Sequence, residues 1–246
     1  MAGAELWTEA LALERTEHGV LVRRRGRDVE VTCGVIIGAD GPHSTVGGWV
    51  GQRNAEFVET AQVEVVLPRP LDAPAVYFDG AYAGGYGWLF PKGETANVGV
   101  GVHPRWGGNP TEALGHLMER LGSQIGAVVG RSGGPVPCGG PLPAIVVGNV
   151  ALAGDAAGHT HAITGAGIFA AVVDGTLAGA AAARALQAGD MSRLAEYGGE
   201  WAEWMGRSLG YAVNKRHDLE RHWSSEPAAL STLIRRTWIA FREYRR

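Results

Sequence analysis

Two short, continuously apolar segments constrain the fold of this chain more than any other feature. Gly34–Ala39 has a Val-Ile-Ile core, and Ile145–Ala153 is apolar except at Gly148-Asn149. Apolar residues without polar alternation are typical of strands buried on both faces, as in a parallel sheet covered by helices. We therefore predict that both segments lie in one core sheet. Each ends in an acid beside a glycine, Asp40-Gly41 and Gly154-Asp155.

The region between these segments has the alternation of an antiparallel sheet. We expect about four strands, able to cover a pocket, at Val58–Leu67, Ala75–Phe78, Tyr86–Phe90 and Ala96–Val102. An amphipathic helix is expected from Thr111 to about Ile125. Gly130–Pro143, rich in glycine and proline, is expected to be a loop or an irregular return.

The flanking regions predict a small meander and a set of helices. The meander strands are Ala10–Arg15, Val20–Arg25 and Val29–Cys33. A helix of small residues is expected over Gly165–Leu186, and two C-terminal helices over Met191–Trp223 and Pro227–Arg246. The fold class is therefore α/β with mixed α+β character.

Composition excludes several classes of function. The 246 residues carry a net charge of −3 and scattered arginines, so a nucleic-acid surface is not expected. Cys33 and Cys138 have no C-x-x-C spacing, which argues against a disulfide framework or zinc site and for a cytoplasmic protein. We expect no signal segment and no transmembrane segment, because no apolar run approaches the roughly 20 residues that span a bilayer.

The segment after the second apolar run has the residues of a ligand site. The Asp155 carboxylate can accept hydrogen bonds from a polyol chain, and the Thr164–Ile168 turn opens a helix whose free N–H groups favour an anionic or electron-rich ligand. Residues Gly165–Ala170 also fit G-x-G-x-x-A, but no second strand ending in an acid follows, so a nicotinamide or adenine site is rejected.

Three aromatic residues share one face of a predicted strand. Tyr86, Trp88 and Phe90 recur at strand period and would form a wall suited to a flat cofactor or a long apolar substrate. Taken alone, such a stripe is more often part of a core.

Neither a metal site nor a catalytic residue can be assigned. His159 and His161 lie two residues apart in a turn, and no carboxylate or cysteine is spaced to complete a metal site. No Ser-His-Asp order or paired carboxylate can be argued from spacing, so hydrolase chemistry has no support.

Together these motifs resemble the flavin-dependent geranylgeranyl reductase family, within the broader group of para-hydroxybenzoate hydroxylase-like flavoproteins. Gly38–Val46 is similar to that group's "DG" motif, and Gly154-Asp155 to its "GD" motif. Tyr86–Gly101 matches the reductases' Y-x-W-x-F-P, seven residues, G-x-G pattern in every fixed position. Asp155–Ile168 is similar to their G-D-A-A-G…T-G-x-G-I form.

The resemblance implies FAD as the cofactor and a prenyl chain or another apolar small molecule as the substrate. Reduced flavin would then deliver hydride to a carbon–carbon double bond. Tyr86, Trp88 and Phe90 would bind the substrate. The residues implied to bind FAD are Asp40, Gly41, Gly154, Asp155, Gly158, Thr164, Gly165, Ala166, Gly167 and Ile168.

The resemblance also implies a domain organisation. Residues 1–54 and 130–190 would form a partial FAD-binding, Rossmann-like layer, residues 55–129 an antiparallel-sheet substrate domain, and residues 191–246 the C-terminal helices.

The sequence departs from the family pattern in ways that bear on FAD binding. Gly47 stands where an arginine is usual, and Ala83 and Ala162 where prolines are common. The family's opening strand and G-x-G-x-x-G turn, which hold the FAD pyrophosphate, have no counterpart upstream of Gly38. We therefore expect weak or absent FAD binding by the isolated chain, with self-association or a second polypeptide that supplies this unit.

Two alternatives stay open. One is a cofactor-free isomerase, cyclase or binding protein on a reduced flavoprotein fold, and the other is a flavin monooxygenase. A flavin absorbance spectrum separates the first from an FAD-dependent enzyme.

Overall fold

The computed structural model describes residues 3–245, which divide into two compact units. Unit 1 comprises Met1–Asn54, Pro141–Thr160 and Gly167–Ser208. Unit 2 comprises Ala55–Gly140, His161–Ala166 and Leu209–Arg246.

Unit 1 begins with the predicted meander. Its antiparallel strands are β1 (Ala10–Arg15), β2 (Gly19–Arg24) and β3 (Arg27–Thr32), paired in chain order. The turn between β2 and β3 places both Arg25 and Gly26 at positive φ, as two-residue hairpins require.

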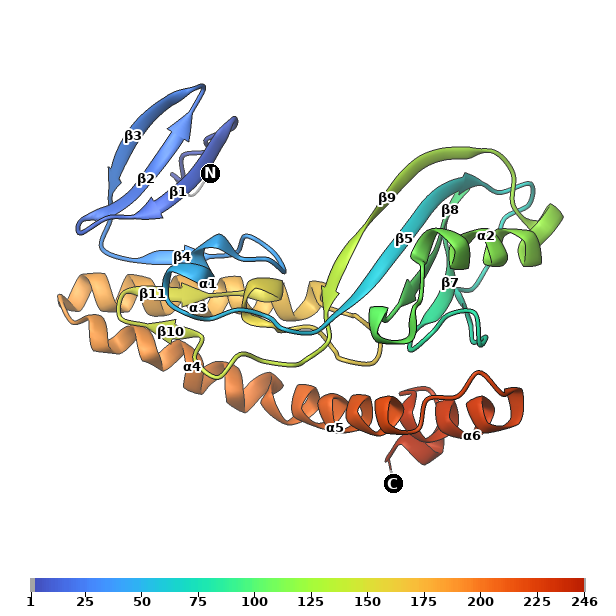
Figure 1. Ribbon diagram of the computed structural model, residues 1–246. Coiled ribbons are helices and arrows are strands. Elements are labelled where there is room, and N and C mark those ends of the chain that lie inside the picture. The colour runs from blue at the N-terminus through green and yellow to red at the C-terminus, as the bar shows by residue number, and fades with distance from the viewer. Residues whose placement is uncertain (1–2, 246) are drawn as a thin grey trace. The chain divides into compact units, whose positions relative to one another are not determined.

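The two apolar segments pair in one sheet of unit 1, as predicted. Strand β4 (Ile36–Gly38) is parallel to β11 (Val150–Leu152), with Ile36 opposite Val150 and Gly38 opposite Leu152 (Figure 1). The expectation of one strand over Ile145–Ala153 is wrong. The chain turns at Gly148, where φ is +61°, so that β10 (Val146–Val147) folds back antiparallel to β11.

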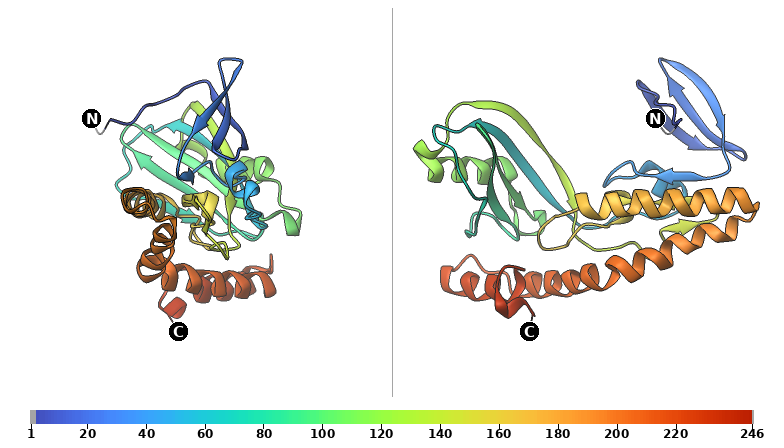
Figure 2. Two further views of the ribbon diagram at one scale, coloured as in Figure 1. Left: turned by 90° about the vertical axis from the view of Figure 1, so that its left-hand side faces the viewer. Right: turned by 180° about the vertical axis from the view of Figure 1, so that it is seen from behind.

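The helices of unit 1 follow the strand ends. Ser44 caps α1 (Thr45–Trp49) by accepting a hydrogen bond from the Gly47 N–H. Helix α3 (Ile168–Ala188) begins three residues later than expected and packs beside α4 (Glu196–Trp201), as Figure 2 shows. A 3-10 turn over Met191–Ala195 precedes α4.

Helix α3 is long and apolar enough to cross a membrane, by length and composition only. One such helix is weak evidence, since the core helices of soluble proteins meet the same criterion, and 33% of the apolar stretch is buried. Its uncovered face within unit 1 is apolar, with Ile168, Phe169 and Val172 all more than 60% exposed.

Unit 2 is built on an antiparallel sheet of five strands. Their order is β6 (Ala75–Tyr77), β7 (Tyr86–Lys92), β8 (Thr95–Val102), β5 (Phe57–Val66) and β9 (Val128–Pro137).

The loop expected over Gly130–Pro143 is wrong, because its first part is strand β9. Glycine and proline lower the strand propensity of this segment, but β9 pairs with β5 over nearly its whole length. A Cβ atom at Gly133 would lie 2.4 Å from the Thr60 carbonyl oxygen, so the close approach of the two backbones requires glycine there.

Helix α2 (Pro110–Leu121) lies across one face of this sheet (Figure 1). The Asn109 side chain caps its first turn. Its Leu114, Leu117 and Leu121 pack on alternate residues of β5 and β8 to make the main core of the unit. The opposite face of the sheet is therefore not covered by α2.

The C-terminal helices are shorter than predicted. The expected helix over Met191–Trp223 is interrupted by a π-helical turn at Ala202–Gly206 and continues as α5 (Arg207–Arg221). Helix α6 (Pro227–Thr237) ends well before Arg246, and a 3-10 turn follows at Arg242–Arg245.

Candidate active site

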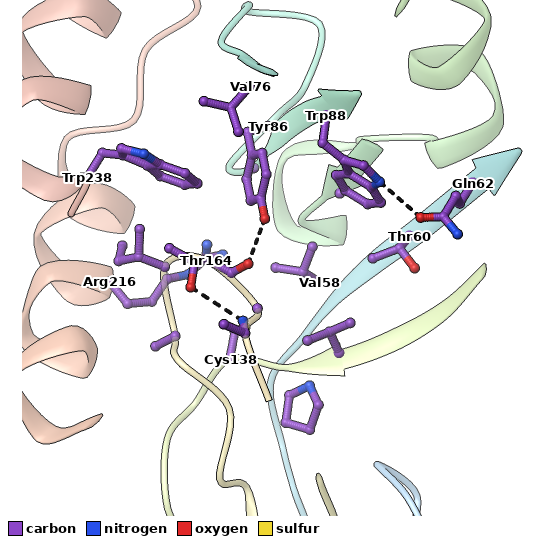
Figure 3. Close-up of a pocket in the computed structure, with 18 of the residues that line it drawn as sticks. Val58, Thr60, Gln62, Val76, Tyr86, Trp88, Cys138, Thr164, Arg216 and Trp238 are labelled. Atoms are coloured by element: carbon purple, nitrogen blue, oxygen red, sulfur yellow. Dashed lines mark hydrogen bonds between the residues drawn. The ribbon is translucent and has the colours of Figure 1, made fainter. Parts of the chain in front are cut away.

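A pocket of about 440 Å³ lies on the face of the five-stranded sheet opposite α2, entirely within unit 2. Its lining comes from all five strands of the sheet and residues next to them, one turn and two C-terminal segments (Figure 3). The lining residues are Val58, Thr60, Gln62, Val76, Gly85, Tyr86, Trp88, Phe90, Gly101, Val136, Pro137, Cys138, Ala162, Ile163, Thr164, Gly165, Ala166, Arg216 and Trp238.

Strand periodicity explains which sheet residues face the pocket. Alternate residues of β5 and β7 point to the face away from α2, whereas Val63, Val65 and Leu89 point into the core. Tyr86, Trp88 and Phe90 therefore share the pocket face, as their spacing predicts.

Two glycines of β8 form the floor between β5 and β7. Gly101 lies opposite Tyr86 and Gly99 opposite Trp88 in the strand register. A Cβ atom at Gly99 would lie 2.3 Å from the Trp88 ring, and one at Gly101 would lie 2.8 Å from Val58. Gly99 thus leaves room for the Trp88 ring of β7, and Gly101 leaves room for the Val58 side chain of β5.

Hydrogen bonds orient two of the aromatic side chains. The Trp88 indole N–H donates to Gln62 Oε1 at 3.0 Å, and the Tyr86 hydroxyl donates to the Thr164 carbonyl at 2.6 Å (Figure 3). Tyr86 and Trp238 pack edge to face with ring centroids 4.6 Å apart, and Phe90 stacks on Trp88 at 6.2 Å. Phe90 is 39% exposed and lies at the open side of the wall.

The end of the pocket near α5 is polar and densely packed. Arg216, 2% exposed, donates from Nε to Glu220 at 2.7 Å and from Nη1 to the Gly84 carbonyl at 2.8 Å. Burial raises the pKa of the neighbouring Cys138 to about 11, so its thiol is protonated at neutral pH. Burial also lowers the pKa of His103, near Glu220, to about 4.

The two acids that end the core strands of unit 1 differ in how their carboxylates are used. Asp40 accepts hydrogen bonds from the Thr45 and Val46 N–H groups at 2.7 and 3.1 Å and from the Ser44 hydroxyl. Its carboxylate is thereby held at the N-terminus of α1. The carboxylate of Asp155 accepts no hydrogen bond from residues 3–245, and burial raises its pKa.

The turn that follows Asp155 is fixed by a buried pair. Asp174 on α3 accepts from the Gly154 N–H at 2.7 Å and lies 2.7 Å from His159 Nδ1, and both side chains are fully buried. The His159 ring stacks on Trp201 at 3.9 Å. His159 thus belongs to the framework of the turn, and the part of the chain that the structure describes holds no group of three potential metal ligands.

Gly167 lies in a tight space where the turn meets α3. A Cβ atom there would lie 3.0 Å from Thr160 and 3.1 Å from Asp155 Oδ1. Gly41, Gly154, Gly158 and Gly165 all have positive φ, which glycine adopts without strain.

The structure brings together some of the predicted site residues but not all. Six of them, Tyr86, Trp88, Phe90, Thr164, Gly165 and Ala166, line the same pocket of unit 2. Asp40, Gly41, Gly154, Asp155, Gly158, Gly167 and Ile168 belong to unit 1, where Ile168 is 86% exposed.

Sequence reasoning missed several lining residues. Val58, Thr60 and Gln62 alternate along a predicted strand, so their shared face was a usable signal. Arg216 and Trp238 come from the C-terminal region, and nothing local in the sequence connects them to the sheet.

Comparison with known proteins found digeranylgeranylglycerophospholipid reductases among the relatives, although no family model matches the chain. It is 36% identical over 218 residues to digeranylgeranylglycerophospholipid reductase 2 of Methanosphaera stadtmanae, covering 80% of this chain and 54% of the relative. It is 31% identical over 245 residues to digeranylgeranylglycerophospholipid reductase of Methanocaldococcus jannaschii, covering 92% and 62%. The chain thus spans only part of the length of these relatives.

Solved structures share the fold. A geranylgeranyl bacteriochlorophyll reductase-like protein from Thermoplasma acidophilum superposes with a TM-score of 0.86 at 25% identity, covering 96% of this chain and 64% of that one. A probable FAD-dependent monooxygenase from Pseudomonas aeruginosa superposes with a TM-score of 0.59 at 21% identity, covering 92% and 66%, which shows likeness of fold alone.

Proposed function

Because relatives at 31–36% identity are digeranylgeranylglycerophospholipid reductases, we propose that the chain is the flavin- and substrate-binding portion of an FAD-dependent oxidoreductase of the geranylgeranyl reductase family that acts on a prenyl chain or another apolar small molecule. When bound, reduced flavin supplies hydride for a carbon–carbon double bond. The chain's own residues bind and orient the flavin and the substrate. The two free cysteines accord with the proposed cytoplasmic location.

One observation carries the proposal. The turn that the resemblance assigns to flavin, Thr164–Ala166, lines the same pocket as the aromatic wall of Tyr86, Trp88 and Phe90. An apolar substrate against that wall would therefore lie next to the cofactor turn, as hydride transfer requires. The wall, floor and sides are largely apolar, so they bind by excluding water from the substrate rather than by ionic contact.

The unit 1 residues fit the ribityl side of the cofactor. The Asp155 carboxylate has no partner among the described residues and is free to accept hydrogen bonds from ribityl hydroxyls. Gly154 and Gly158 shape the turn that presents it, and Gly167 leaves room beside it. At the end of β4, the Asp40 carboxylate caps α1, so the cofactor would contact backbone groups around Gly41 there.

Replacing Asp155 tests the cofactor assignment. We expect Asp155→Ala to weaken FAD binding by about 1.5–3 kcal/mol, the range for a hydrogen bond to a charged group. The measurement is titration with FAD, followed by flavin fluorescence, of each variant completed with a polypeptide that bears the G-x-G-x-x-G unit. Asp72→Ala, at an exposed loop position, is the matched control and is expected to leave the dissociation constant unchanged. Equal affinity in both variants would reject the role of Asp155.

Replacing Trp88 tests the substrate wall. Trp88→Ala is expected to weaken binding of geranylgeraniol more than it lowers stability, because the ring lies on the pocket face and not in the α2 core. Tryptophan fluorescence and thermal unfolding give the two measurements. Global unfolding of the variant would instead assign the aromatic stripe to the core.

The pyrophosphate end of FAD requires a further contribution, which we propose comes from polypeptide outside residues 1–246 or from self-association. The relatives from Methanosphaera stadtmanae and Methanococcoides burtonii are nearly twice as long as the matched region. Within unit 1, β4 is an edge strand, and the exposed apolar side chains of α3 offer a surface for a covering element. A polypeptide bearing the G-x-G-x-x-G unit is expected to raise FAD affinity and reduce self-association, both measurable by titration and light scattering.

The reductase reading is preferred to a monooxygenase. The monooxygenases share the fold, whereas the relatives above 30% identity are reductases. Incubation of the FAD-loaded, completed protein with a prenyl substrate and a reductant separates the two activities. The product of a reductase has two more hydrogen atoms than the substrate, whereas the product of a monooxygenase has one more oxygen atom.

A further inference from the structure

The turn His161–Ala166 is held by side chains from both ends of unit 2. Within the turn, the His161 N–H donates to the Ala166 carbonyl at 3.0 Å and the Gly165 N–H donates to the His161 carbonyl at 2.8 Å. From β7, the Tyr86 hydroxyl donates to the Thr164 carbonyl at 2.6 Å. The Thr164 peptide is therefore fixed at its carbonyl by a residue 78 positions earlier in the chain.

Tyr86 is suited to this bond by its surroundings. Burial raises its pKa to about 12, so the hydroxyl stays protonated and acts as the donor. Its ring packs between Trp88 and Trp238, at centroid distances of 5.6 and 4.6 Å. The side chain thus forms part of the pocket wall with its ring and bonds the turn with its hydroxyl (Figure 3).

His161 holds the adjacent amide of the same residue. The Thr164 N–H donates to His161 Nδ1 at 3.3 Å, so the neutral ring carries its proton on Nε2. Nε2 lies 3.4 Å from the Tyr244 hydroxyl, which comes from the C-terminal 3-10 turn. Burial lowers the pKa of His161, which keeps the ring neutral and Nδ1 free to accept.

We propose that Tyr86 and His161 are positioning residues that together fix the two peptide groups on either side of the Thr164 Cα and so hold the cofactor turn at the substrate wall. One residue binds the Thr164 carbonyl and the other the Thr164 N–H. The link to flavin rests on the proposed function, whereas the conformation of the turn can be measured without any cofactor.

Hydrogen exchange of the full 246-residue chain tests the fixing of the turn. In Tyr86→Phe, which keeps the ring, we expect the amides of Thr164, Gly165 and Ala166 to exchange about threefold to tenfold faster, the equivalent of one neutral hydrogen bond. Trp88→Phe is the matched control, because it removes the bond to Gln62 from the same strand and face. It is expected to leave exchange in the turn unchanged.

A second pair of variants separates positioning from general support of the fold. His161→Leu removes the acceptor for the Thr164 N–H, whereas His161→Asn can restore an oxygen near the position of Nδ1. Exchange in the turn is expected to rise in His161→Leu and to return toward the wild-type rate in His161→Asn, with β8 amides unchanged in both. Identical turn exchange in wild type, Tyr86→Phe and His161→Leu would overturn the proposal.

The functional readout uses protein completed with the G-x-G-x-x-G polypeptide and loaded with FAD. Tyr86→Phe is expected to shift the flavin absorption spectrum while geranylgeraniol affinity stays within about twofold, because the ring remains. An altered turn exchange together with no FAD binding by any form would refute the proposed function and leave the fixing of the turn supported. Altered turn exchange with an unchanged flavin spectrum would overturn the link to the cofactor.

Discussion

The clearest quantitative test of the pocket is to add one methyl group to its floor. Gly99→Ala places a Cβ atom 2.3 Å from Trp88 Cζ2 and 2.5 Å from Cε2, whereas carbon atoms pack at about 3.5–4.0 Å. The indole must therefore move by about 1 Å or more. That movement breaks its 3.0 Å bond to Gln62, while the α2 core on the other face of the sheet is untouched.

The expected cost follows from these contacts. Overpacking costs about 1–3 kcal/mol, and loss of one neutral hydrogen bond about 1 kcal/mol. Replacing glycine by alanine in a strand returns about 0.5–1 kcal/mol. We expect a net loss of about 1–3 kcal/mol in the free energy of unfolding, and weaker binding of geranylgeraniol.

Denaturant unfolding followed by circular dichroism measures the stability, and tryptophan fluorescence measures ligand binding. Gly115→Ala in α2 is the matched control, because a Cβ atom there meets nothing within 4 Å. It is expected to stabilise the chain by about 0.5–1 kcal/mol, as alanine does in an exposed helix interior. If Gly99→Ala were equally stabilising and bound the ligand normally, the Trp88 ring could not lie over β8.

Two further predictions concern buried histidines. His103 has its pKa lowered to about 4 in the folded chain, against about 6.5 unfolded, so the unfolded state binds the proton first. Its contribution to stability is therefore complete above pH 6.5 and is lost as the pH falls toward 4. The free energies of unfolding of wild type and His103→Asn should diverge between these two pH values. Parallel curves would contradict the assignment. Asp174→Ala leaves His159 and the Gly154 N–H without their acceptor and is expected to lower the free energy of chemical unfolding by about 3–5 kcal/mol. Asp174→Asn, which keeps an oxygen, is expected to cost less. Equal costs would show that this oxygen is not the relevant contact.

The sequence could predict those parts of the fold in which the residues of one segment are enough to indicate its structure. The continuous apolar runs identified β4 and β11, and one core sheet was predicted for both because strands buried on both faces belong in a covered sheet. Strand β9 was missed, because Gly130, Gly133 and Gly134 read locally as a loop. The backbone of β5 explains Gly133, since its close approach excludes a side chain there.

The aromatic wall was predictable for the same reason, but the rest of the pocket was not. The spacing of Tyr86, Trp88 and Phe90 determines that they share a face whatever lies nearby. The function of Gly99 and Gly101 depends on the register of β8 against β7, which two short segments do not encode separately. Trp238 and Arg216 reach the pocket only through the packing of the C-terminal helices.

The two acids at the strand ends show why a pattern does not determine a role. Asp40 and Asp155 both lie beside a glycine after a buried strand. After Asp40 the chain starts α1 within five residues, so the free N–H groups of that helix take up the carboxylate. After Asp155 the chain makes a 3-10 turn ending at Gly158, and the next helix does not begin until Ile168. No helix N–H therefore competes for the Asp155 carboxylate, and an acid in this position can bind a ligand's hydroxyls only when the chain that follows leaves it unused.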